Sequence, residues 1–272
     1  MATILAMPEA FAERTAPLPI RRLLRAYLIE AKYETLNALR TPAFALPFIF
    51  IPVAIYFLFG VLMAGGESGQ TESEWGPGIV NYLFAGFSVI AVIMPGIFSG
   101  VGLAIEREGG LLKLKRALPI PPGAILIAKC LTSICVTAIA LSLVLTVALL
   151  TDTITLTLAQ IAVIYSVLLV GCLPFCAIGF FIGAIASGSA APAYGNLLFL
   201  PMMWLSGLFI PLPDFLERFM IIWPAFHLNQ LALGLAGIEE FSFFPPAMSA
   251  AVLLGVTVLF GGLAVRRLAR VG

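Results

Sequence analysis

The sequence predicts an all-α membrane protein with six transmembrane helices and with both termini in the cytoplasm. Its 272 residues are 61% hydrophobic and only 11% charged, and their mean hydropathy is +1.08. Soluble domains carry about 25% charged residues, so this chain is solvated mainly by lipid. The net charge of +1 gives no bulk attraction to nucleic acid, and no nucleic-acid partner is expected.

Six stretches are long and apolar enough to cross a membrane, which takes roughly 20 residues of helix. None of them contains an acidic residue, and they are residues 44–64, 79–104, 123–150, 158–186, 193–210 and 247–265. Lys129 lies in the third, about two turns from its predicted cytoplasmic end, where a long side chain can reach the headgroups. Residues 44–272 are therefore predicted to form a single transmembrane domain.

The distribution of basic residues predicts the orientation of these spans. With six spans, one side of the membrane holds fourteen of the fifteen lysines and arginines, and the other side holds Arg218 with eight acidic residues. Short cytoplasmic loops are enriched in Lys and Arg, so both termini are predicted to be cytoplasmic.

Residues 1–43 form a cytoplasmic N-terminal region with an amphipathic helix at about 19–40, PIRRLLRAYLIEAKYETLNALR. One side of this helix carries apolar residues, namely Ile20, Leu24, Tyr27, Leu28, Ala31 and Leu39. Arg22, Arg25 and Lys32 fall on the other side, which is typical of a helix lying on the inner membrane surface. A soluble helix that leads into the first span is the alternative.

The segment before the sixth span, residues 211–246, is predicted to be external. A seventh span within it would bury Glu217 and Arg218 and would send the basic C-terminal tail outside. Pro224 also divides the stretch into pieces that are too short to cross. We therefore expect external helices that lie on, or dip into, the outer leaflet as re-entrant helices and that pack against the spans.

The usual catalytic motifs are missing from the sequence. It contains no GxxxxGK[ST] phosphate loop, GxGxxG, HExxH or GxSxG motif, and its four cysteines form no CxxC pair. The lone His227 is expected to be an interface residue rather than a base. Spans without Asp or Glu also argue against an ion-coupled carrier. The chain therefore predicts a path through the membrane without its own energy source, which points to a partner.

Two GxxxG spacings occur within the predicted spans. They are formed by Gly96 with Gly100 and by Gly179 with Gly183. Small residues at this spacing let helices approach closely. The sequence leaves open whether they serve packing within the chain or dimerisation.

The loop at residues 105–122 contains a charged stretch bounded by helix breakers. Residues 106–123 read EREGGLLKLKRALPIPPG, in which two glycines precede, and three prolines follow, about two turns of helix at 111–117. So short a helix is marginal alone in water, which favours docking against a partner. A loop whose leucines rest on the bilayer explains the same residues.

The whole chain resembles the type 2 ABC transporter permease family. In this loop the family pattern is roughly Glu, Arg or Lys, Glu, any residue, Gly, Thr, Leu, and then a proline before the third span. The matching residues are Glu106, Arg107, Glu108, Gly110, Leu112 and Pro119, while Leu111 stands where many members have Thr. The stretch LPMMWLSGLFIPLPDFLERFMIIWPAFHLNQLALG, residues 200–234, also resembles the family.

The resemblance implies that the loop carries a coupling helix, which seats on a separate ATPase subunit. The contact residues it implies are Glu106, Arg107, Glu108, Gly110, Leu111, Leu114, Leu118 and Pro119. The implied transporter has two ATPases and two permease copies, identical or related, in a bacterial cytoplasmic (inner) membrane. ATP is used by the partner subunit, and this chain is expected to bind no cofactor or metal.

The family's route runs between the two permeases, largely along the first, second and fifth spans. By this analogy the candidate lining residues are Asn81, Ser88, Asn196, Met202, Met203 and Ser206. The resemblance thus implies an exporter permease for a hydrophobic or amphipathic solute, drug-like or lipid-like. The residues alone also leave open a stand-alone ion-coupled carrier or channel, and a membrane scaffold or sensor component.

Overall fold

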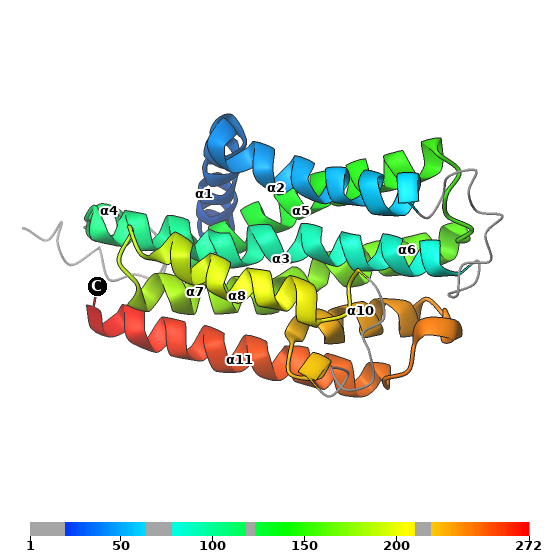
Figure 1. Cartoon of the computed structure of the whole chain (residues 1–272). Coiled ribbons are helices and arrows are strands. Elements are labelled where there is room, and N and C mark those ends of the chain that lie inside the picture. Colours follow the sequence, from blue (N-terminus) through cyan, green and yellow to red (C-terminus); the bar gives the residue numbers. More distant parts are fainter. Residues whose placement is uncertain (1–19, 64–77, 118–122, 210–218, 272) are drawn as a thin grey trace, which may run out of the picture.

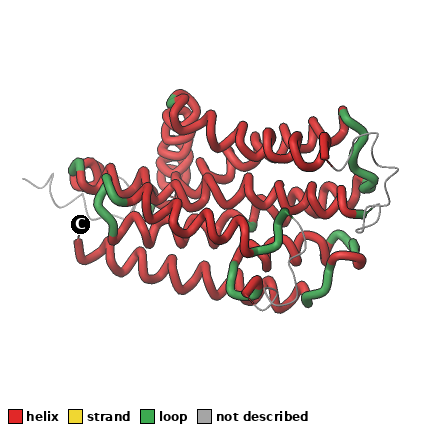
Figure 2. Tube along the Cα trace, in the orientation of Figure 1, coloured by secondary structure: helices red, strands yellow, loops and turns green. Residues whose placement is uncertain are grey.

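The chain folds into a bundle of long helices with one helix lying across it (Figure 1). The computed structural model describes residues 20–63, 78–117, 123–209 and 219–271, and no strand occurs among these residues (Figure 2). Helix α4 (Leu111–Ala117) and the C-terminal end of α11 (Pro246–Val271) lie at one end of the bundle. Helix α10 (Pro224–Leu235) lies at the opposite end.

Helix α3 (Ile79–Glu108) is the central helix of the bundle. It packs against α7 (Cys172–Ile185), α5 (Ala124–Leu150) and α8 (Ala191–Leu205), and nearly all its side chains from Ile79 to Gly100 are buried. A helix that is apolar all round is suited to such a position. By contrast, α11 keeps a broad apolar face exposed, as expected of a helix at the lipid boundary.

Five helical stretches among the described residues are long and apolar enough to span a membrane. They are Ala45–Leu62, Ile79–Glu108, Ala124–Leu150, Leu158–Ile185 and Pro246–Arg270. Five of the six predicted spans therefore correspond to observed helices. The remaining one, the fifth predicted span at residues 193–210, coincides with α8, whose 15 residues cover about 23 Å at 1.5 Å per residue. A sixth crossing stays a prediction, as does the cytoplasmic side of both termini.

Prolines explain two irregularities within these spans. The first span begins as α2 (Pro42–Ile55) and continues as a π-helix, Tyr56–Met63, after Pro47 and Pro52. The fourth is broken at Gly171 into α6 (Leu158–Val170) and α7, in whose first turn Pro174 has no N–H to continue the hydrogen-bond ladder.

Helix α1 (Ile20–Arg40) matches the predicted N-terminal helix and lies across the bundle against α5 (Figure 1). Ala31 is buried in this contact, and the Thr35 and Thr132 hydroxyls hydrogen bond at 3.0 Å. Leu24 and Leu28 remain exposed. Exposed leucines suit the predicted position on the membrane surface, which stays a prediction.

Helix α10 begins at Pro224, the residue predicted to divide the segment before the last span. It packs against α11, α6 and α3 rather than lying apart from the bundle. His227 is 1% exposed and its Nε2 lies 2.9 Å from the Ile221 carbonyl oxygen, so the expectation that it is an interface residue was wrong. Gln230 ties the same helix to the Phe241, Phe243 and Phe244 backbone.

The two GxxxG pairs meet each other within one chain. A Cβ on Gly179 would lie 2.5 Å from the carbonyl oxygen of Ile97, and one on Gly96 would lie 2.6 Å from the Cβ of Phe175. Gly100 and Gly183 face the partner helix in the same way. The glycines therefore serve close packing of α3 against α7.

Candidate functional site

The predicted two-turn helix after the second span is present as α4. Helix α3 continues through Glu108 and ends at Gly109, and Gly110 takes a positive φ of 74° before α4 begins. This left-handed conformation favours glycine, and it turns the chain sharply between the two helices. Leu118 and Pro119, two of the predicted contact residues, lie outside the described residues.

Arg107 and Glu108 attach the end of α3 to the link between α7 and α8. The Arg107 guanidinium donates to the carbonyl oxygens of Ala184 and Ala186, the second at 2.5 Å. The Glu108 carboxylate accepts from the Gly188 backbone N–H at 2.6 Å. A helix end leaves carbonyl groups without partners, and Arg107 satisfies two of them at the end of α7.

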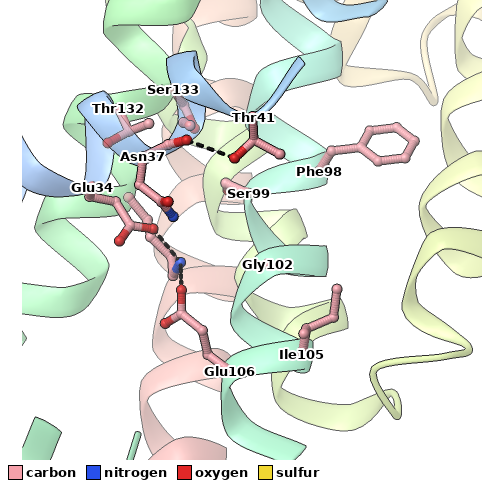
Figure 3. A pocket seen from close by; sticks show the side chains of 12 residues that line it. Glu34, Asn37, Thr41, Phe98, Ser99, Gly102, Ile105, Glu106, Thr132 and Ser133 are labelled. Atoms are coloured by element: carbon pink, nitrogen blue, oxygen red, sulfur yellow. Dashed lines mark hydrogen bonds and ion pairs between the residues drawn. The ribbon is translucent and has the colours of Figure 1, made fainter. Parts of the chain in front are cut away.

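Glu106 points to the other side of α3, into an ion cluster of five residues. The cluster consists of Glu30 and Glu34 of α1, Glu106 of α3, Lys115 of α4 and Lys129 of α5. The Lys129 ammonium lies 2.6 Å from Glu34 and 2.7 Å from Glu106 (Figure 3). The Lys115 ammonium lies 2.9 Å from Glu30 and 3.8 Å from both Glu34 and Glu106.

The ion cluster surrounds Lys129, whose contact with the headgroups stays a prediction. Its side chain is 5% exposed and is held by two carboxylates. A buried charge is tolerated in a span when it is paired and hydrogen bonded.

Lys115 links α4 to α1 through the same cluster. Burial acts to lower the pKa of Lys115, but the hydrogen bond to Glu30 and the Glu106 and Glu34 carboxylates together raise it above its ordinary value. Lys115 therefore stays protonated well beyond neutral pH, and its bond between α4 and α1 persists.

The leucines of α4 divide between the two sides of the helix. Leu112 is buried against the bundle, whereas Leu111 is 46% exposed and Leu114 is 64% exposed. Lys113 is also exposed. The α4 end of the bundle thus carries a short, firmly attached helix with apolar side chains directed outward.

The comparison with known families agrees with this geometry. The sequence pattern of the family described as ABC-2 type transporter matches residues 25–240, about four fifths of the chain. This chain belongs to the ABC-2 type transporter family. A search of curated proteins finds no match.

Membership has direct consequences for function. An ABC-2 chain is the membrane-spanning permease component of an ABC transporter and works with an ABC ATPase subunit. Such permeases generally lack an ATPase site of their own, in agreement with the missing phosphate loop. The chain is a multi-pass membrane protein.

The structure of this ABC-2 permease gives the predicted contact residues two different surroundings. The side chains of Glu106, Arg107 and Glu108 bind other parts of the same chain, while Leu111 and Leu114 are exposed. A contact of these residues with an ATPase stays a prediction. The internal bonds explain how the charged residues hold α4 in place.

The candidate lining residues of the permease are also dispersed. Ser88, Met202, Met203 and Ser206 are buried within the chain. Asn196 is exposed on α8, and Asn81 is half-buried with hydrogen bonds to Thr155. A route between two permease copies runs along exposed surface, so in this conformation Asn196 and Asn81 remain the better placed of the six.

Sequence reasoning missed the ion cluster. Glu30, Glu34 and Lys129 were not among the predicted site residues, although Lys129 is the one charged residue within the six predicted spans. A lysine within a membrane span is usually paired with an acidic side chain. That signal was available, but of the two partners Glu106 lies 23 residues away in sequence and Glu34 lies 95 residues away, on α1.

Proposed function

We propose that this chain is the permease subunit of an ABC exporter and that α4 is the surface on which the ATPase docks. Two copies of the permease, identical or related, pair with two ATPase subunits in a bacterial inner membrane. The solute is hydrophobic or amphipathic, because the spans are apolar and carry scattered Ser, Asn and Met side chains. The exposed Leu111 and Leu114 on α4 carry this proposal.

Helix α4 is suited to docking because it is short but firmly held. Seven residues are far below the roughly 12 that an isolated helix needs in water. Gly110, the buried Leu112 and the Lys115 ion pairs fix it to the bundle, so little conformational entropy remains to be lost when a partner binds.

The bonds that attach α4 to the bundle are also suited to transmit a movement of α4 to the spans. Lys115 ties α4 to α1, and Lys129 ties the same carboxylates to α5. Arg107 and Glu108 tie the preceding end of α3 to the α7–α8 link. When the ATPase dimer closes and opens, a displacement of α4 is therefore expected to reach the spans through α1, α3 and α5.

Co-purification tests the partnership directly. The chain, expressed at near-native level and isolated in mild detergent, should bring down a protein with an ATP-binding cassette. A stable, active assembly without such a protein, or transport by the purified chain in vesicles without ATP, would instead favour a stand-alone carrier or channel.

Substitutions in α4 test the docking surface. Leu111→Asp with Leu114→Asp should abolish ATP-driven transport and release the ATPase while the permease stays folded, because both side chains are exposed in the free chain. Lys113→Asp is the matched control, since it places the same side chain at an exposed α4 position on another side. Normal coupling in the double variant would show that the ATPase docks elsewhere.

A further inference from the structure

A cavity of about 400 Å³ lies between α1, α3 and α5, next to the ion cluster (Figure 3). Its volume falls within the range of about 300–1,000 Å³ typical of small-molecule sites. Glu34, Glu106 and Lys129 form its charged part, and Phe98 and Ile105 supply apolar wall. The ion cluster is thus both a structural link and part of the wall of a ligand-sized space.

The charge of the ion cluster is unbalanced. Three carboxylates face two ammonium groups, which leaves a formal charge of −1. The Oε2 atom of Glu106 is buried and makes no hydrogen bond to any described residue, and its distance to the Lys115 ammonium is 3.8 Å. Excess negative charge in a partly buried site favours one further cation.

Three of the four hydroxyl groups in the cavity wall also prefer a ligand that donates. Ser99 donates to the Gly96 carbonyl at 2.6 Å, and Ser133 donates to the Pro95 carbonyl at 3.0 Å. Thr41 donates to the Asn37 carbonyl at 2.8 Å. A hydroxyl has one proton, so these three oxygens present only lone pairs to the cavity.

The cavity opens toward the exposed side of α1 and α3. Asn37, Thr41 and Ile105 are exposed, and the half-buried Phe98 also lines the cavity. An aromatic ring and aliphatic side chains suit the apolar body of a ligand, and aromatic faces attract organic cations. The ligand that fits both parts of the wall is amphipathic.

We propose that this cavity is a binding site for an amphipathic organic cation, with the cationic group at the Glu34 and Glu106 carboxylates and the apolar body against Phe98 and Ile105. Both a free solute and a lipid with an ammonium headgroup have this chemistry. The site lies in the permease chain itself, so the proposal does not depend on whether α4 docks an ATPase.

Ethidium, a permanently charged aromatic cation, is a suitable probe. The full chain in nanodiscs of phosphatidylglycerol is titrated with ethidium and followed by fluorescence anisotropy, with empty discs as background. We expect saturable binding that weakens about tenfold or more in Glu106→Gln and in Glu34→Gln, because each removes a charged partner. Glu240→Gln, an exposed carboxylate on η4 (Glu239–Phe241) at the other end of the bundle, should bind like the wild type.

The charge of the ligand gives a second readout that needs no variant. Anilinonaphthalene sulfonate, an aromatic anion of similar size, should neither bind the site nor displace ethidium from the wild-type chain. Displacement by the anion, or equal ethidium affinity in both Gln variants and the wild type, would overturn the proposal.

A change of lipid separates the two sources of the ligand. If an ammonium lipid occupies the site, discs that contain phosphatidylethanolamine should weaken ethidium binding to the wild type but not to Glu106→Gln. Equal ethidium affinity in both kinds of disc would assign the site to free solutes.

Discussion

Lys129 is a single charge placed where the bilayer disfavours charge, in a helix long enough to span the membrane. Its burial is compensated by two carboxylates from different helices, Glu34 at 2.6 Å and Glu106 at 2.7 Å. Replacing all members of a buried ion pair with apolar groups is often neutral, whereas removing one partner leaves an uncompensated charge. Lys129 therefore couples the position of α1 to the stability of α3 and α5.

The first prediction follows from this asymmetry. Lys129→Met should destabilise the folded chain by about 3–5 kcal/mol, because Glu34 and Glu106 then lose their nearest counter-ion and keep only Lys115, at 3.8 Å from each. The measurement is the thermal unfolding midpoint in detergent. The double variant Lys129→Met with Glu106→Gln should recover part of the loss. If Glu106→Gln shifts the unfolding midpoint equally in the wild type and in Lys129→Met, the pair is not energetically coupled.

A pH-dependent prediction belongs to His227, which lies outside the five candidate spans. Burial lowers the pKa of His227, although the hydrogen bond to the Ile221 carbonyl opposes this. A depressed pKa in the folded chain means that stability is complete above the ordinary value of about 6.5 and is lost as the pH falls below it. Because Nε2 donates to the Ile221 carbonyl, the neutral Nδ1 accepts from the Ser249 hydroxyl at 3.5 Å, and protonation would reverse the direction of this hydrogen bond.

The matched variant is His227→Gln, which keeps a donor for Ile221 but does not titrate. Between pH 7.5 and 5.5 the unfolding midpoint of the wild type should fall more than that of the variant. If the unfolding midpoints of the wild type and the variant fall in parallel, protonation of His227 on unfolding does not contribute to the loss of stability at low pH.

Among the elements, the closest contact is that of α3 with α7. The carbonyl of Gly179 occupies the space that a Cβ on Gly100 would need, whereas a Cβ on Gly255 of α11 would meet nothing within 4 Å. Alanine at Gly100 therefore tests interhelical packing, whereas alanine at Gly255 tests helix propensity.

Gly100→Ala should separate α3 from α7 and cost about 1–3 kcal/mol or more, as overpacking in a rigid core does. Gly255→Ala should leave stability unchanged or raise it by up to about 1 kcal/mol, because Ala is the better helix former. The unfolding midpoints of the two variants in detergent decide this. A Gly100→Ala protein as stable as the wild type would mean that α3 and α7 can shift apart without loss of stability.

Elements bounded by local signals were predictable from sequence, and interactions across the fold were not. Gly110 and the prolines after Leu118 lie beside the helix that they delimit, so α4 was predicted at 111–117, where it is found. The burial of Ser88 and Met202 depends on which face of a helix turns inward, and apolar residues cover both the lipid-facing and the protein-facing sides. The partners of Glu106 and Lys129 likewise required the arrangement of α1 against α5.

At the scale of the whole molecule, polar bonds at the α4 end join helices that are far apart in sequence. The ion cluster joins α1, α3, α4 and α5, and Arg107 with Glu108 joins α3 to the α7–α8 link. Paired charges in a partly buried setting have defined geometry and resist sliding. We infer that this end moves as one body when the ATPase changes state.

A disulfide within this body tests that inference. The Thr35 and Thr132 hydroxyls lie 3.0 Å apart, so the sulfur atoms of cysteines at the same positions would need to approach by only about 1 Å to reach the S–S bond length of about 2.05 Å. In a chain whose four native cysteines are replaced by alanine or serine, Thr35→Cys with Thr132→Cys should crosslink on oxidation, and each single variant should not. Because α1 and α5 belong to the same body, ATP-driven transport should be equal before and after oxidation. A loss of transport on oxidation that dithiothreitol reverses would mean that α1 moves relative to α5 during the cycle, and failure to crosslink would contradict the position of α1 itself.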